Sequence, residues 1–193
     1  YSSKKLSYAL EPGDHKAWDE IVSKLYSPEE RHKIEWAIGA IVSGDSKWIQ
    51  KFVVFYGDSG TGKSTILNII SDIFGGNIDK GGYVAAFKSK AIGSGNSEFA
   101  LEPLKDNPLV AIEHDGDLSR IEDNTTLNSL VSHETMPVNT KYGKIYPMTF
   151  HTFLFLGTNR PVKITDSKSG VIRRLIDISP TGNLIPNKKY NQL

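Results

Sequence analysis

The chain has 193 residues, of which 38% are hydrophobic and 23% are charged, and its formal net charge is +1. This composition is typical of one soluble domain with a hydrophobic core, and the apolar runs are too short to span a bilayer. The absence of cysteine excludes disulfides and thiolate metal sites. Together with the short apolar runs, the composition leads us to expect a soluble, cytoplasmic protein with no membrane partner and no structural metal.

Two helices are predicted in residues 1–50. The first follows Asp14, which can cap it, and its apolar residues recur at helical spacing. The second begins with a capping box at residues 27–30 and ends near Gly44. We interpret residues 1–50 as an N-terminal helical collar and residues 51–193 as a nucleotide-binding core. We also expect the chain to be a fragment of a longer protein.

A glycine-rich loop lies between the apolar run 52–56 and a helix predicted over residues 66–74. It matches the phosphate-loop pattern G-x-x-x-x-G-K-[ST] in the strand-loop-helix context that the pattern requires. Glycines let the backbone wrap around a phosphate, Lys63 would reach the β- and γ-phosphates, and the Ser64 hydroxyl would hold Mg²⁺. The residues expected to bind the nucleotide are Gly57, Asp58, Ser59, Gly60, Thr61, Gly62, Lys63, Ser64 and Thr65.

The segment that follows the helix is read as turns, a strand and a loop. Paired glycines at 75–76 and 81–82 predict turns, and residues 83–87 can form a second strand. Residues 88–97 are rich in Gly, Ser and Lys, so we predict a mobile loop there, followed by a short helix that ends at Leu104.

Carboxylates follow the next apolar run, residues 108–112, which predicts another buried strand. After a phosphate loop, acidic residues at a strand end indicate a Walker B arrangement, in which one carboxylate holds Mg²⁺ and another orients the attacking water. Glu113, at the strand end, is the first candidate for these roles and for the metal. Asp115 is the second, and the division of labour between them stays open.

The stretch from 135 to 174 is the basic part of the chain, and residues 136–150 read as two strands around a turn. The turn carries Lys141 and Lys144, with Tyr142 between them. Lysines at the tip of a hairpin can contact a phosphate backbone, while a tyrosine can stack on a base. The sequence thus predicts a DNA-binding hairpin, although a solvated turn is the more common use of such a pattern.

Two further patterns follow strand predictions. The apolar run 153–156 ends near Asn159, whose amide can hydrogen-bond the attacking water or the γ-phosphate. Arg173 and Arg174 stand directly before the strand predicted over 175–178. Paired arginines at that position suit a γ-phosphate contact across a subunit boundary, and an internal ion pair is the alternative.

Taken in order, these patterns resemble the superfamily 3 helicases, and more narrowly the helicase module of phage and plasmid primase-helicases. The resemblance runs from about Glu30 to Pro180. It implies an α/β fold of the P-loop, AAA+-like type, with a central mostly parallel sheet flanked by helices, a helical collar and a β-hairpin insertion. One feature departs from the family, because His114 separates Glu113 from Asp115 where adjacent acids are usual.

The resemblance also implies an activity and its residues. It implies a hexameric homo-oligomeric ring that hydrolyses ATP with Mg²⁺ and unwinds duplex DNA by translocating on a single strand of forked DNA, with a primase portion in the parent protein. Lys63 and Ser64 match the phosphate-loop ligands, Glu113 the Walker B acid and Asn159 the sensor asparagine. Arg173 or Arg174 matches the arginine finger, and Lys141 and Lys144 match the DNA-contacting hairpin.

Two other readings stay open. A nucleotide switch or small-molecule kinase needs neither the lysine hairpin nor the paired arginines, and its activity would ignore DNA. An ATP-dependent initiator that melts an origin has the same patterns, and only an unwinding assay separates it from a helicase.

Overall fold

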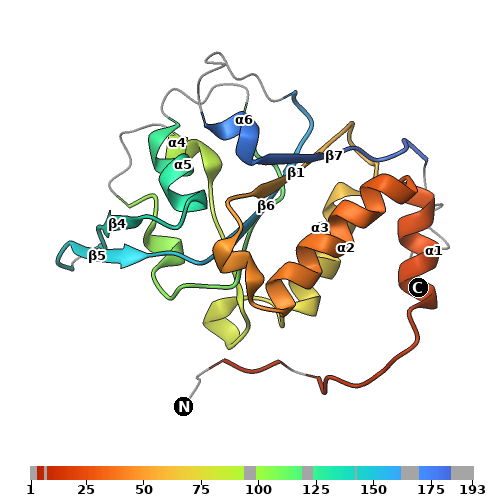
Figure 1. Ribbon diagram of the computed structural model, residues 1–193, viewed down its shortest axis with the longest axis horizontal. Coiled ribbons are helices and arrows are strands. Elements are labelled where there is room, and N and C mark those ends of the chain that lie inside the picture. Colours follow the sequence, from red (N-terminus) through yellow and green to blue (C-terminus); the bar gives the residue numbers. More distant parts are fainter. Residues whose placement is uncertain are drawn as a thin grey trace.

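A five-stranded sheet forms the centre of the fold (Figure 1). The computed structural model describes residues 4–6, 8–93, 99–118, 124–141, 143–161 and 170–183. The strands lie in the order β2-β3-β6-β1-β7, and every neighbouring pair is parallel. Their bounds are β1 (Phe52–Tyr56), β2 (Val84–Ala86), β3 (Val110–Glu113), β6 (Phe153–Thr158) and β7 (Leu175–Ile178). The predicted α/β class with a parallel sheet is confirmed.

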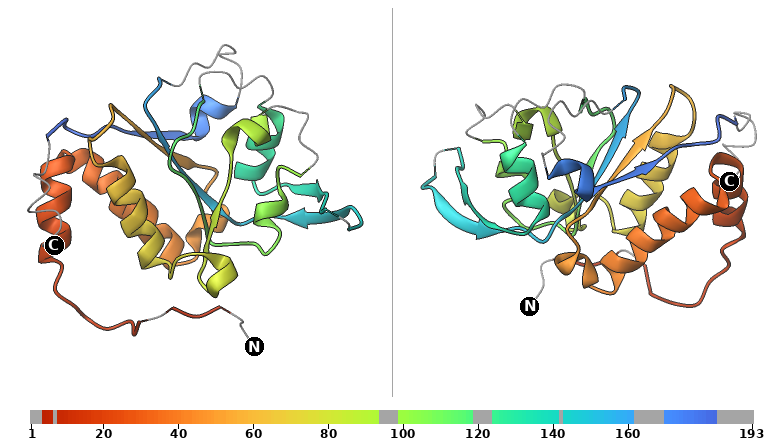
Figure 2. Two further views of the ribbon diagram at one scale, coloured as in Figure 1. Left: turned by 180° about the vertical axis from the view of Figure 1, so that it is seen from behind. Right: turned by 45° about the horizontal axis from the view of Figure 1, so that its top comes forward.

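Helices flank this sheet, because a parallel sheet buries both of its faces. The α-helices are α1 (Lys16–Leu25), α2 (Pro28–Val42), α3 (Lys63–Ile73), α4 (Ser89–Gly93), α5 (Thr125–Val131) and α6 (Val171–Arg174). Short 3₁₀ turns among the described residues are η1 (Asp45–Trp48), η2 (Ile78–Lys80) and η3 (Glu102–Leu104). Figure 2 shows α2 and α3 running side by side, with α1 at one end of the pair.

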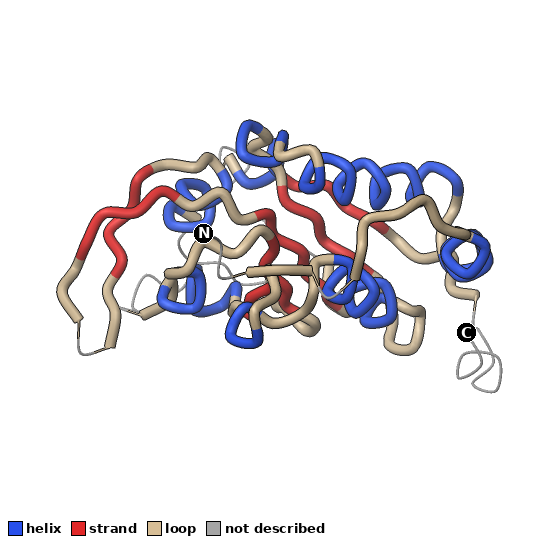
Figure 3. Tube along the Cα trace, turned by 90° about the horizontal axis from the view of Figure 1, so that it is seen from below, coloured by secondary structure: helices blue, strands red, loops and turns tan. Residues whose placement is uncertain are grey.

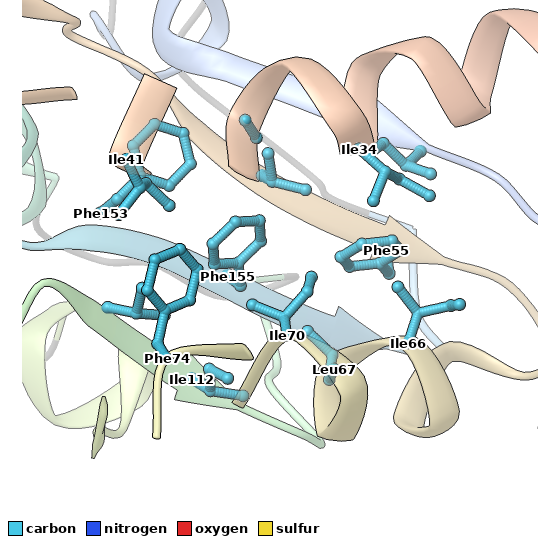
Figure 4. Packing of buried hydrophobic residues seen from close by; sticks show 14 of the residues in the cluster. Ile34, Ile41, Phe55, Ile66, Leu67, Ile70, Phe74, Ile112, Phe153 and Phe155 are labelled. Carbon is cyan, nitrogen blue, oxygen red and sulfur yellow. The ribbon is translucent and has the colours of Figure 1, made fainter. Parts of the chain in front are cut away.

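Side chains alternate between the two faces of the sheet and divide the core into two clusters. On one face, Phe55 and Phe155 lie between the isoleucines of α2 and those of α3, as Figure 4 shows. Rings of Phe55 and Phe155 stack with their centroids 6.5 Å apart. On the other face, apolar residues of β1, β3 and β6 pack against α4, α5 and α6. The N-terminal helices therefore share a core cluster with the sheet.

Local sequence explains the start of α2 and only part of the start of α1. The Ser27 hydroxyl accepts a hydrogen bond from the Glu30 amide at 3.3 Å, as the capping box predicts, and proline occupies the first turn. For α1, the cap position is His15, and Asp14 accepts from the Lys16 amide at 2.8 Å. Gly44, after α2, is left-handed with φ of 80°.

A two-stranded antiparallel hairpin, β4 (Thr135–Val138) with β5 (Tyr146–Thr149), projects from the body of the fold (Figures 1 and 3). It confirms the hairpin predicted from the sequence. The prediction of a loop over residues 88–97 is wrong in its first half, because residues 89–93 form α4. Residues 94–98 lie outside the described part of the chain. None of the helices in the described residues has the length and apolarity needed to cross a membrane.

Candidate nucleotide-binding site

The glycine-rich loop connects the end of β1 to the start of α3. Gly60 and Gly62 have φ values of +81° and +89°, a conformation that non-glycine residues rarely adopt. The Thr61 hydroxyl donates to the Asp58 carbonyl at 2.7 Å and closes the loop internally. The helix that begins at Lys63 directs its positive dipole end toward the loop.

Lys63 is a buried cation inside this loop. The residue is 6% exposed, and its Nζ donates to the carbonyls of Gly57 and Asp58, both at 2.7 Å. Among the described residues, no carboxylate lies within ion-pair distance of it. Burial lowers the pKa of Lys63, and the nearby charges of Asp58 and Asp115 oppose that shift. A buried ammonium group held only by carbonyl oxygens fits an anionic ligand in the loop.

A cleft of about 350 Å³ opens beside the loop. It brings together residues from three strand ends, as expected where parallel strands finish at one edge of a sheet. Asp115 and His114 follow β3, and Asn159 follows β6. The full lining is Leu25, Ser59, Gly60, Gly62, Lys63, Ser64, Thr65, His114, Asp115 and Asn159. One cation, one carboxylate and one amide thus share a cavity within the size range of small-ligand sites.

The two loops that carry Asp115 and Asn159 are tied together. The Gly116 amide donates to the Gly157 carbonyl at 2.7 Å. A Cβ at Gly157 would lie 2.7 Å from the His114 carbonyl, so only glycine permits this approach. Arg160 and Asp117 form an ion pair at 2.6 Å across the same gap. These contacts fix the spacing between the carboxylate and the amide that line the cleft.

Glu113 does not line the cleft. It lies on the β3 face that carries Ala111, which packs in the cluster with α4 and α5, and its side chain is buried. Its carboxylate accepts the Ser89 amide at 2.7 Å, and Lys88 Nζ lies 3.9 Å away. The first choice for the Walker B acid and metal ligand therefore lies outside the cleft lining. Strand alternation turns Glu113 away from the glycine-rich loop, whereas Asp115, beyond the strand, reaches the cleft.

The residues present fit a magnesium ion bound together with a nucleotide. Mg²⁺ in such sites takes one or two protein oxygens and completes its shell with phosphates and water. Ser64 and Asp115, both in the cleft lining, are the residues that would hold it. Within the described residues, no group of three or more His, Asp or Glu could hold a metal alone.

The paired arginines lie outside this cleft and differ from each other. Arg174 is buried, and it donates to the Ser132 hydroxyl at 2.6 and 3.0 Å and to the Gly170 carbonyl at 2.9 Å. Burial and the neighbouring Arg173 charge lower the pKa of Arg174, while Glu134 raises it. Arg173 is exposed, and its carbonyl accepts a hydrogen bond from Lys51. Of these two arginines, Arg173 is the one that is exposed to another molecule.

The lysines of the hairpin turn lie away from the cleft, at the tip of β4 and β5. Lys141 and Lys144 are exposed, and the Lys141 amide donates to a Glu102 carboxylate oxygen at 3.1 Å. Tyr142 lies outside the described residues. Sequence reasoning missed Leu25, which comes from α1, and His114 as cleft residues. For His114, the available sequence signal was its position next to Glu113, a candidate acid.

A family model matches residues 55–174, which is more than half of the chain and covers every cleft residue except Leu25. The chain belongs to the family of unknown function DUF5906. This DUF5906 chain matches no curated protein.

Solved structures share the fold of this DUF5906 chain. They include the A-form apo structure of the NrS-1 C-terminal region, residues 305–718 (TM-score 0.57, 20% identity, 83% of this chain covered). An apo structure of the same region gives a TM-score of 0.61 at 17% identity over 86% of the chain. A further A-form apo structure of this region gives a TM-score of 0.55 at 17% identity over 86% of the chain. The chain spans 37%, 39% and 41% of these neighbours, and at such identities the likeness concerns the fold alone.

Proposed function

We propose that this chain is the ATP-hydrolysing module of a DNA helicase of a phage-type replication protein. The observation that carries the proposal is the cleft, where the buried ammonium of Lys63 lies in a glycine loop opposite Asp115 and Asn159. A buried cation held by backbone carbonyls, together with an acid and an amide at the ends of parallel strands, supplies the groups that phosphoryl transfer from a nucleotide to water requires.

Each cleft residue has one task in this proposal. Lys63 neutralises the β- and γ-phosphate oxygens, and the loop amides and the α3 dipole bind the remaining charge. Ser64 and Asp115 would hold Mg²⁺, and the ion would offset charge on the transferring phosphoryl group. In this proposal Asp115 also serves as the base for the attacking water, and Asn159 orients that water.

The helicase part of the proposal rests on the hairpin and the arginines. Lys141 and Lys144 lie in the turn between β4 and β5, at the tip of a hairpin that projects from the body of the fold (Figure 3), where they can contact a phosphate backbone. Arg173 is exposed and lies at the far end of the sheet from its own cleft, so a contact between Arg173 and a γ-phosphate would have to come from a neighbouring subunit of a homo-oligomeric ring.

Unwinding of a forked duplex in the presence of ATP and Mg²⁺ tests this function. The helicase proposal predicts strand separation that requires ATP and a single-stranded tail. ATP hydrolysis that DNA leaves unchanged would instead identify a nucleotide switch or kinase. DNA melting limited to a few base pairs would identify an origin-melting initiator.

A further inference from the structure

The hairpin of β4 and β5 forms a small sheet of its own, and its root is the junction with the end of α5. This helix end has the hydrogen bonds of a Schellman motif. The His133 amide donates to the Leu130 carbonyl at 3.2 Å, and the Glu134 amide donates to the Ser129 carbonyl at 3.0 Å. Glycine is usual at the position of His133, whose φ is 59°. A histidine held in this conformation indicates a use for its ring.

Ser132, the residue before His133, ties the hairpin root to α6. Its hydroxyl accepts hydrogen bonds from Nη2 and Nε of Arg174 at 2.6 and 3.0 Å. Arg174 is 7% exposed, and bonds from a guanidinium in a shielded place are stronger than bonds between neutral groups in water. Next to Arg174 in the chain is Arg173, the arginine that the proposed function assigns to the nucleotide of a neighbouring subunit.

The His133 ring forms a second connection from the same root. Its Nδ1 lies 2.9 Å from the Phe150 carbonyl oxygen, and its Nε2 lies 3.2 Å from the Ile49 carbonyl oxygen. An imidazole carries a proton on at least one ring nitrogen, so in either tautomer one of the two carbonyls accepts from the ring. Ile49 precedes β1, and Lys51, two residues later, donates to the Arg173 carbonyl. A second path thus connects the hairpin root to Arg173.

We infer that Ser132 and His133 are positioning residues that couple the DNA-binding hairpin to Arg173. Bound DNA that displaces the hairpin would move its root, and the contacts of Ser132 and His133 would pass the displacement to the segment that carries Arg173. Through these two residues, hydrolysis depends on whether the hairpin holds DNA. The inference rests on the proposed function for the roles of the hairpin and of Arg173, and it adds the residues that connect them.

Stimulation of ATP hydrolysis by single-stranded DNA tests this coupling in Ser132→Ala, with Ser129→Ala as the matched control. Ser129 lies on the same helix, but its hydroxyl donates to the Glu134 carboxylate at 2.6 Å and not to α6. Ser132→Ala should bind single-stranded DNA, and hydrolyse ATP without DNA, as the wild type does, while the stimulation factor falls at least about twofold. Ser132→Thr keeps a hydroxyl and should recover most of the stimulation, and Ser129→Ala should keep all of it.

His133→Gly tests the second path in a variant whose backbone suits the fold. Glycine adopts the left-handed conformation readily, so the change removes the ring contacts and keeps the helix end. Stimulation by DNA should again fall at least about twofold, with DNA affinity unchanged.

Three results would overturn the inference alone. They are full stimulation in Ser132→Ala or His133→Gly, a loss in Ser129→Ala equal to that in Ser132→Ala, and a loss of stimulation matched by an equal loss of DNA affinity. A wild type that hydrolyses ATP at the same rate with and without DNA would instead overturn the proposed function and the inference together.

Discussion

The carboxylate of Glu113 accepts a hydrogen bond from the backbone amide of Ser89 at 2.7 Å, on the face of the sheet opposite α3. It thereby fixes the start of α4 to the end of β3. Glu113 thus makes a contact that holds two elements together, whereas Asp115, two residues later, lines the cleft.

Substitution of the two acids should separate stability from activity. Glu113→Ala leaves the Ser89 amide buried without an acceptor, which should lower the free energy of unfolding by about 1–3 kcal/mol in urea titrations. Glu113→Gln keeps an acceptor oxygen and should retain most ATP hydrolysis. Asp115→Asn should change stability by less than about 0.5 kcal/mol and reduce hydrolysis about 10²-fold or more. Loss of hydrolysis in Glu113→Gln with normal hydrolysis in Asp115→Asn would reverse the two roles.

The adjacent arginines should also behave differently. Arg174→Ala removes a buried guanidinium with three hydrogen bonds to Ser132 and Gly170, which should cost about 2–3 kcal/mol of stability. Arg173→Ala should fold with wild-type stability, because its side chain is exposed.

Mixed rings test whether Arg173 acts across the subunit boundary. Arg173→Ala and Lys63→Ala subunits should each be inactive alone. In a mixture, some interfaces combine an intact loop with an intact arginine, so part of the ATPase activity should return. If mixed rings assemble but stay inactive, Arg173 does not complete the neighbouring site.

The ion pair of Arg160 with Asp117 should matter for positioning more than for stability. Arg160 is 67% exposed, so Asp117→Asn should cost less than about 1 kcal/mol of unfolding free energy. The same change loosens the contact between the loops of Asp115 and Asn159, and kcat should fall while KM for ATP changes little. A double-mutant cycle with Arg160→Gln should show coupling in kcat. Additive effects on kcat would argue that the pair does not position the loops.

The hairpin lysines should contribute to DNA affinity through phosphate contacts. Replacing Lys141 and Lys144 with alanine should weaken binding of single-stranded DNA and reduce the slope of log K against log salt by about 1–2. ATP hydrolysis without DNA should stay the same. Lys80 and Lys105, exposed lysines elsewhere, provide the matched double substitution. If both double variants lose DNA affinity equally, the loss comes from the lower overall positive charge and not from a contact of the hairpin with DNA.

The sequence predicted the sheet and the loop well because their signals are local. Apolar runs marked all five strands, β7 at its observed bounds, and the capping box at Ser27 marked the start of α2. The glycine pattern before Lys63 predicted the strand-loop-helix unit. Each of these features depends on neighbours within a few residues.

The features that the sequence could not predict depend on tertiary contacts. Residues 89–93 have the Gly, Ser and Lys content of a loop, but the buried Glu113 carboxylate binds the start of a helix there. The choice between Glu113 and Asp115 depends on where β3 ends and which face each residue occupies. Leu25 reaches the cleft only because α1 packs in the same cluster as α3.

The rate of ATP hydrolysis by wild-type and Lys63→Ala protein, with and without single-stranded DNA, tests the central claim most directly. Circular dichroism first checks that the variant is folded. We expect that it is, because the Lys63 side chain donates to carbonyls of its own loop. The account predicts hydrolysis that single-stranded DNA stimulates in the wild type and no hydrolysis in Lys63→Ala under either condition. Hydrolysis at the wild-type rate by folded Lys63→Ala would contradict it.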